Sequence, residues 1–218
     1  MKFISKSIEG YKGIKIPYKL YGKTEDSQDL YIFLPGSGYT VNSPVFHYTS
    51  GILFNNNKDI LEINYSYKAD LYHEFSKEEI IKAVKIDSRL VIDTVLETNT
   101  YKNFYFIGKS LGTIAMSSEL RREKFKESKV IWLTPLLNLD EVIDTIVNSG
   151  NKGFCIIGDE DEIYSEELFG RLKQNTNLMS KLIPSANHSL DHNSDSIISI
   201  DILKDIITDI DTFLSEDY

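Results

Sequence analysis

The residues with the clearest chemical potential form the motif Gly108-Lys109-Ser110-Leu111-Gly112. The motif follows an apolar run that predicts a buried strand, and it precedes a stretch with helical periodicity. A serine at such a sharp strand-to-helix turn exposes its hydroxyl at the carboxyl edge of the sheet, and glycines on either side leave room because they lack a Cβ atom. The Leu111 N–H lies at the start of the helix, where it can stabilise developing negative charge. The motif therefore predicts a nucleophilic serine, Ser110.

A phosphate-binding loop is the main alternative for a Gly-Lys-Ser sequence. That loop requires a glycine at the position that Asn103 occupies in this chain, and Leu111 and Gly112 also fit it poorly. We therefore reject phosphate binding at this turn.

In this setting the chain resembles the α/β-hydrolase superfamily, and the resemblance covers nearly its whole length. It implies a nucleophile, an acid and a histidine in that order along the chain. Gly158 to Asp161 matches the G-x-x-D pattern that carries the acid, and the loop Pro184–His188 resembles the one that holds the histidine. The implied triad is Ser110, Asp161 and His188.

Both partners of the serine have alternatives. Asp159 takes the acid role if a one-residue bulge shifts the loop into a different register. The other histidines are His47, His73 and His192, and of these only His192, like His188, follows the last predicted strand. The choice of histidine therefore rests mainly on the resemblance.

The spacing of His188 and His192 also occurs in metal-binding pairs on helices. However, Pro184, Asn187 and Asn193 make this segment a poor helix, and no third ligand is evident. We expect neither a metal nor an organic cofactor.

The loop Pro35-Gly36-Ser37-Gly38 is a candidate for the second part of an oxyanion hole. It follows a predicted strand and resembles the H-G-x-G loop of the superfamily, with Pro35 in place of the histidine. The resemblance implies that the N–H groups of Ser37 and Leu111 form the hole, with Gly38 as an alternative donor. A plain turn is the remaining interpretation.

Four residues are predicted to line a substrate site: Gly38, Tyr39, Lys109 and Tyr65. The candidate walls are the segments Tyr39–Asn42 and Tyr65–His73, whose tyrosines offer apolar area with a polar edge. Lys109 could favour the oxyanion or pair with an acid, and the sequence does not separate these roles.

Short β-rich runs alternate with helical patterns along the whole chain. The runs are Ile14–Tyr21, Leu30–Leu34, Asp59–Asn64, Phe104–Ile107, Val130–Leu133, Phe154–Ile157 and Leu178–Ile183. Ser43-Pro44 predicts the start of a helix that ends near Phe54, Ser76–Glu79 predicts a capping box, and an apolar stripe from Ile198 to Phe213 predicts a C-terminal helix on the core. The pattern favours an α/β fold with a mostly parallel sheet, helices on both faces and an antiparallel edge formed by the first two strands.

The spacing of the later strands leaves little room for a cap. About twenty residues separate the strand that ends near Thr134 from the one that begins near Phe154, and Leu136–Val147 predicts a single amphipathic helix there. We therefore expect no large cap and an open site that suits short acyl groups.

Composition limits the remaining possibilities. The chain has 218 residues and is expected to form a single domain over residues 1–218. Its net charge of −9 disfavours nucleic acid as a partner, and no apolar run is long enough to span a membrane. Cys155 is the single cysteine, which excludes an internal disulfide, and the N-terminus has no apolar signal region. A cytoplasmic location is expected, and the oligomeric state stays open.

These features predict a serine hydrolase that cleaves a small carboxylic ester through an acyl-enzyme. A thioesterase, an amide hydrolase or a dienelactone-type hydrolase is the alternative within acyl transfer. Outside catalysis, the alternative is a silent member of the fold that binds a ligand or a partner protein.

Overall fold

The computed structural model describes residues 1–65, 67 and 74–216, and it contains alternating strands and helices. The strands are β1 (Lys2–Glu9), β2 (Lys15–Gly22), β3 (Asp29–Leu34), β4 (Asp59–Ile63), β5 (Asn103–Lys109), β6 (Lys129–Leu133), β7 (Gly153–Gly158) and β8 (Leu178–Ile183). The helices are α1 (Pro44–Asn55), α2 (Lys77–Thr98), α3 (Gly112–Glu119), α4 (Asp140–Asn148), α5 (Glu166–Leu172) and α6 (Ser196–Ser215), with short 3₁₀ turns at Tyr11–Gly13 and Glu123–Phe125.

Within the described ranges, the strands form one eight-stranded sheet in the order β1-β2-β4-β3-β5-β6-β7-β8. β1 pairs with β2 and β2 with β4 in antiparallel fashion, and every other pairing is parallel. The predicted α/β fold with a mostly parallel sheet is therefore confirmed. The order reverses beside β3, so the carboxyl ends of β3 and β5 lie next to each other, where ligands bind in open α/β sheets.

The prediction that the runs Ile14–Tyr21 and Leu30–Leu34 form an antiparallel edge was wrong, because these two runs do not pair with each other. The run Ile14–Tyr21 pairs with the unpredicted strand β1, while the run Leu30–Leu34 lies inside the sheet between β4 and β5. β1 carries lysine, serine and glutamate at most positions and is largely exposed, so its apolar pattern is weak. The residues of β3 from Leu30 to Leu34 are all buried, which requires cover on both faces.

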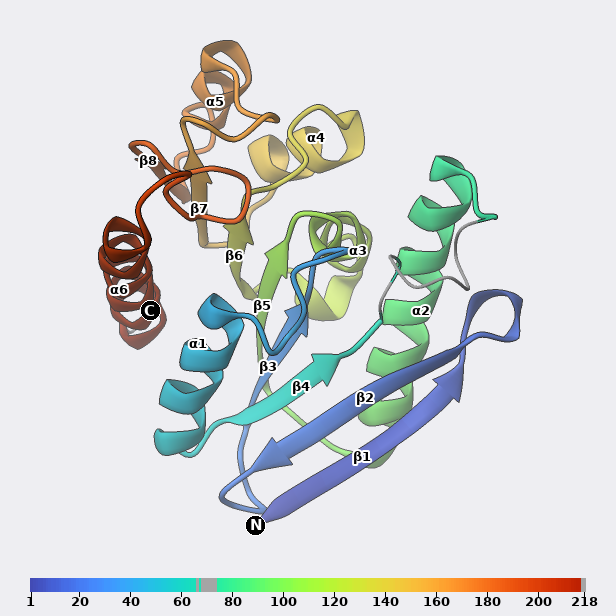
Figure 1. The fold of residues 1–218 in the computed structure, drawn as a ribbon. Coiled ribbons are helices and arrows are strands. Elements are labelled where there is room, and N and C mark those ends of the chain that lie inside the picture. Colours follow the sequence, from blue (N-terminus) through green and yellow to red (C-terminus); the bar gives the residue numbers. More distant parts are fainter. Residues whose placement is uncertain (66, 68–73, 217–218) are drawn as a thin grey trace.

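Helices cover both faces of the sheet, as predicted. Figure 1 shows α1 and α6 on one side and α2, α3 and α4 on the other, and each group packs on its own cluster of buried apolar side chains. α6 contributes Ile206, Ile210 and Phe213 to this core. The apolar stripe predicted that Ile198 faces the core, but its side chain is 41% exposed. The buried residues of α6 all lie in the second half of the helix.

Two helix starts follow the sequence signals. Ser76 and Glu79 form the predicted capping box, since each side chain bonds the backbone N–H of the other residue. α1 begins at Pro44 as predicted, although the Ser43 side chain makes no capping hydrogen bond.

The connection between β6 and β7 contains α4 and no further helix, so this connection adds no large cap at the carboxyl edge of the sheet. The sequence did not predict α5, a helix of 7 residues between β7 and β8. No helix in the described part of the chain combines the length and apolar character needed to cross a bilayer.

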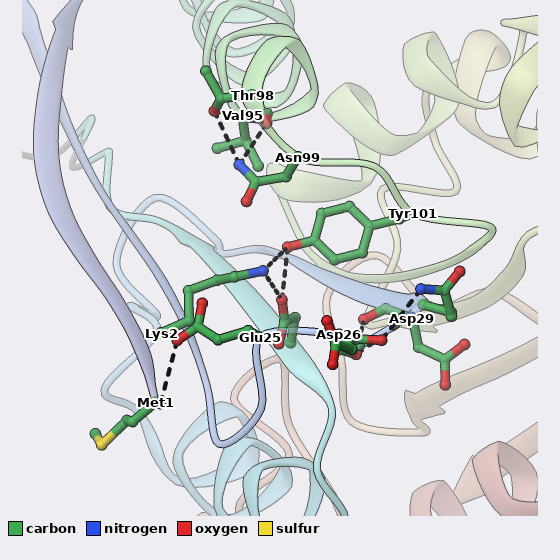
Figure 2. Close-up of polar contacts among 12 residues, drawn as sticks. Met1, Lys2, Glu25, Asp26, Asp29, Val95, Thr98, Asn99 and Tyr101 are labelled. Carbon is green, nitrogen blue, oxygen red and sulfur yellow. Dashed lines mark hydrogen bonds and ion pairs between the residues drawn. The ribbon is translucent and has the colours of Figure 1, made fainter.

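A buried polar cluster joins the N-terminal edge of the sheet to its centre (Figure 2). Lys2 Nζ donates to Asp59 Oδ2 at 2.7 Å and to the Tyr101 hydroxyl at 3.2 Å, and that hydroxyl donates to the same carboxylate oxygen at 2.7 Å. Asp59 is fully buried at the start of β4. Because a buried carboxylate is costly without partners, Lys2 and Tyr101 stabilise this end of the sheet.

We predict that Tyr101→Phe lowers the free energy of unfolding by about 1–3 kcal/mol, because it removes a buried hydrogen bond to a carboxylate. Tyr48→Phe is the matched control, since Tyr48 is 55% exposed. Urea unfolding of both variants checks the prediction, and equal stability of the two would contradict it.

Candidate active site

Ser110 occupies a strained turn directly after β5. Its φ angle is +49°, in the left-handed region that non-glycine residues rarely adopt. The turn is fixed by a hydrogen bond of 3.0 Å from the Ser110 N–H to the Leu133 carbonyl at the end of β6. Ser110 lies at this turn between β5 and α3, and it lines a cleft.

The two glycines of the motif make unequal contacts. A Cβ atom on Gly112 would lie 1.9 Å from the carbonyl oxygen of Leu34, so the start of α3 touches the end of β3 backbone to backbone. A Cβ atom on Gly108 would meet the Met116 sulfur at 3.2 Å, a contact that a flexible side chain can relieve. The position of the turn thus depends mainly on Gly112.

Ser110, His188 and Asp161 form a continuous hydrogen-bonded chain. The Ser110 Oγ lies 2.8 Å from His188 Nε2, and His188 Nδ1 lies 2.9 Å from Asp161 Oδ2. An ionised carboxylate only accepts hydrogen bonds, so Nδ1 carries the proton and Nε2 is free to accept one from the serine. This arrangement matches the geometry of a nucleophile, its base and the group that orients the base.

Asp161 is buried, and both of its carboxylate oxygens have partners. Oδ2 contacts the histidine, and Oδ1 accepts a hydrogen bond of 2.8 Å from the Ile163 N–H. Asp159, the alternative acid, is exposed and its Oδ1 accepts from the Ser185 N–H at 2.6 Å. Asp159 therefore holds the start of the histidine loop, while Asp161 contacts the ring.

The other histidines lie elsewhere. His47 is exposed on α1, and the His192 ring accepts a hydrogen bond of 3.3 Å from the Ser194 N–H. Residues 188–192 form turns and not a helix, so His188 and His192 do not present a helical ligand pair. The described residues contain no group of three metal-ligating side chains, and His73 lies outside the described residues.

The loop after β3 lies beside the serine. A Cβ atom on Gly36 would be 3.3 Å from the Ser110 Cβ, and the Gly36 N–H donates to the Tyr39 carbonyl at 3.0 Å. Among the described residues, neither the Ser37 N–H nor the Leu111 N–H has an acceptor. Two backbone donors near Ser110 therefore have no acceptor within the described part of the chain.

Tyr65 does not line the site, which corrects the prediction made for it. It is buried, and its hydroxyl donates to the Pro35 carbonyl at 2.9 Å. Tyr65 therefore supports the loop that carries Ser37 from behind. The predicted wall Tyr65–His73 otherwise lies outside the described residues, apart from the buried Tyr67.

The Lys109 side chain points into the protein and is 1% exposed. Its Nζ donates to Thr134 Oγ1 at 2.7 Å and to the His188 carbonyl at 2.6 Å, so its hydrogen bonds to described residues go to uncharged oxygens. Burial lowers the pKa of this ammonium to about 7, although the nearby carboxylates of Asp161 and Asp191 act in the opposite direction. Neither role considered for Lys109 from the sequence describes these contacts.

A cleft of about 400 Å³ opens over Ser110. Its lining includes Ser37, Gly38, Tyr39, Lys109 and His188 from the predicted set, together with Leu136, Glu162, Ile163 and Ser189. These last four residues were not predicted from the sequence. Leu136, Glu162 and Ile163 follow the carboxyl ends of β6 and β7, and that position is the signal by which they could have been found.

A larger hollow of about 500 Å³ lies far from this chemistry. It is lined by residues such as Arg121, Asp144 and Asn151, near the amino ends of β6 and β7. Since ligands of open α/β sheets bind at the carboxyl ends of the strands, the smaller cleft over Ser110 is the functional candidate.

No protein-family model and no curated protein sequence matches this chain, but solved structures do. A protein of unknown function from Agrobacterium tumefaciens, provisionally assigned as an α/β hydrolase, gives a TM-score of 0.71 at 20% identity, covering 97% of this chain and 96% of that one. A serine hydrolase without a lid from Xanthomonas campestris gives 0.67 at 15% identity over 100% and 97% of the two chains. An esterase from Pyrococcus furiosus gives 0.71 at 15% identity over 98% and 91%.

The chain has the α/β-hydrolase fold. This confirms the fold that the sequence motif implied. The single helix α4 between β6 and β7 agrees with the short connection expected from the spacing of these strands. At such low identity the likeness concerns the fold alone, so the chemistry must be argued from the residues around Ser110.

We predict that Gly112→Ala lowers the free energy of unfolding by about 3 kcal/mol or more, because its Cβ atom would overlap the backbone of β3. Gly108→Ala is the matched control within the same α/β-hydrolase turn, and it should lose about 1 kcal/mol or less. Urea unfolding of both variants tests the prediction. Equal losses would mean that the contact with Leu34 does not position the turn.

Proposed function

We propose that this protein is a serine hydrolase that cleaves a small carboxylic ester through an acyl-enzyme. The observation that carries the proposal is the hydrogen-bonded chain from Ser110 Oγ through the His188 ring to the Asp161 carboxylate. A catalytically silent binding protein has no need to keep a serine in a strained backbone conformation with an aligned base. The geometry therefore favours catalysis over binding alone.

The mechanism follows from the proton positions. His188 Nε2 accepts the Ser110 proton as Oγ attacks the carbonyl carbon of the ester, and the negative charge passes to the carbonyl oxygen. Asp161 keeps Nδ1 protonated and stabilises the imidazolium that forms. The imidazolium then protonates the leaving alcohol, which departs and leaves the acyl group on Ser110.

Deacylation uses the same groups. Nε2 takes a proton from a water molecule, which attacks the acyl carbon, and the proton returns to Ser110 as the acid leaves. In both halves of the reaction we assign the oxyanion to the N–H groups of Ser37 and Leu111, which have no acceptor among the described residues.

The cleft supports a small substrate. Its volume of about 400 Å³ lies at the lower end of the usual range for small-molecule sites, and α4 provides no cap above it. Thioesters, amides and dienelactones would follow the same acyl chemistry, and a panel of these substrates separates them from simple esters.

Reaction with a fluorophosphonate probe tests the nucleophile. We predict that Ser110 alone becomes labelled, and that Ser110→Ala abolishes labelling and lowers turnover of p-nitrophenyl acetate by roughly 10⁶-fold. Ser189→Ala is the control, because Ser189 also lines the cleft but lacks an aligned base. Peptide mapping after labelling identifies the modified residue, and labelling that persists in Ser110→Ala would exclude Ser110 as nucleophile.

The acid is tested by two aspartate variants. We predict that Asp161→Asn lowers kcat by about 10⁴-fold, because an amide at this position no longer holds the productive tautomer of His188. Asp159→Asn should cost far less, since the Asp159 carboxylate contacts the Ser185 backbone and not the ring. The opposite ranking in steady-state kinetics would assign the acid role to Asp159.

Chain length tests the size of the acyl site. We predict that kcat/KM for p-nitrophenyl esters stops rising by about eight carbons, because an open cleft gives longer chains little surface on which to gain about 0.8 kcal/mol per methylene. The measurement compares acetate through palmitate below the solubility limit of each ester. A steady rise towards palmitate would instead indicate a long apolar channel.

A further inference from the structure

Lys109 stands beside the proposed nucleophile, yet the proposed mechanism does not use its amine. Three contacts hold it: the hydrogen bonds to Thr134 Oγ1 and to the His188 carbonyl, and the face of the Tyr39 ring, whose centroid lies 4.6 Å from Nζ. These partners come from the loops that follow β6, β8 and β3, and Lys109 itself ends β5. One side chain therefore connects the ends of four strands around the site.

The contact with His188 is the specific one. Among the described residues, Lys109 is the sole donor to the His188 carbonyl, which would otherwise lie at a partly buried position without a partner. The ring of the same residue must stay within 2.9 Å of Asp161 and 2.8 Å of Ser110. Fixing the backbone of His188 therefore limits how far its ring can move between these two groups.

Burying the Lys109 amine is energetically unfavourable. The amine loses its hydration, and burial disfavours its charged form strongly enough to bring the pKa to about 7. The groups that face it are the carboxylates of Asp161 and Asp191 and the ring of Tyr39. Both the ammonium and the neutral amine carry enough hydrogens to donate to two oxygens, so the bond to the His188 carbonyl persists in either state.

We propose that Lys109 is a positioning residue, which holds the backbone of His188 so that the imidazole stays aligned between Asp161 and Ser110. This inference rests on the proposed serine-hydrolase function. Lys109 lies almost entirely beneath the surface of the cleft, so its loss should affect the chemical step more than substrate binding.

The test begins with Lys109→Met, which keeps the length of the side chain and removes the donor. We expect kcat for p-nitrophenyl acetate and the rate of fluorophosphonate labelling to fall by about 10²-fold, with KM changed less than about threefold. The melting temperature should stay within a few degrees of the wild type, because the loss of one hydrogen bond is offset by the removal of a costly buried amine.

Lys129→Met is the matched control. Lys129 is 2% exposed and donates to backbone carbonyls near the end of α6, including that of Phe213, away from Ser110. It should leave kcat and the labelling rate unchanged. An equal fall in kcat for both variants would show that the loss of any buried lysine impairs the enzyme.

Chemical rescue with an added amine distinguishes loss of the hydrogen bond to His188 from a general disruption of the structure. Lys109→Ala leaves a space next to the cleft, and n-propylamine should restore part of its kcat by supplying the donor again. The same amine should not raise kcat of Lys109→Met, whose side chain fills the space. A rise in the wild type or in Lys109→Met would reveal attack of the amine on the acyl-enzyme instead.

The outcomes distinguish failure of the positioning role of Lys109 from failure of the proposed hydrolase function. Unchanged kcat in Lys109→Met, a rise in KM alone, or unfolding of both Lys109 variants would overturn the positioning role. A wild-type protein that neither reacts with the fluorophosphonate nor hydrolyses the ester would refute the proposed function itself. Normal wild-type labelling combined with full activity of Lys109→Met would refute only the inference.

Discussion

The close approach of α3 to the end of β3 is the constraint on which the site depends. Gly112 touches the Leu34 backbone so closely that any Cβ atom would overlap it. This contact sets the distance between the start of α3 and the end of β3. Ser110 adopts the left-handed region at this turn, and it lines the cleft above the strand ends. The loop that contains Gly36 packs against the Ser110 Cβ as a consequence of the same spacing.

A second close approach positions the loop that carries His188. A Cβ atom on Gly158 would lie 1.9 Å from the Ala186 carbonyl, and the Glu160 N–H donates to that same oxygen at 3.1 Å. The loop that carries His188 therefore lies directly on the turn that holds Asp161. In both places a glycine at the end of a strand lets another backbone approach closely.

The sequence predicted the parts of this arrangement that leave a local signal. The strand-to-helix turn at Ser110, the capping box at Ser76 and most strands are determined by residues that are close together in the sequence. The edge strand β1 was missed because its mainly polar residues carry almost no apolar periodicity. The choice between Asp159 and Asp161, the burial of Tyr65 and the partners of Lys109 depend on contacts between residues far apart in the chain, and no local pattern contains them.

The polar groups around Ser110 are joined by a network of hydrogen bonds. Asp161, His188, Ser110, Lys109 and Thr134 share hydrogen bonds with one another or with nearby backbone groups. The Ser37 and Leu111 N–H groups lack an acceptor among the described residues. In the proposed acyl transfer, an oxygen that gains negative charge binds N–H donors more strongly than a neutral carbonyl does, so the proposed oxyanion site would stabilise the transition state more than the bound ester.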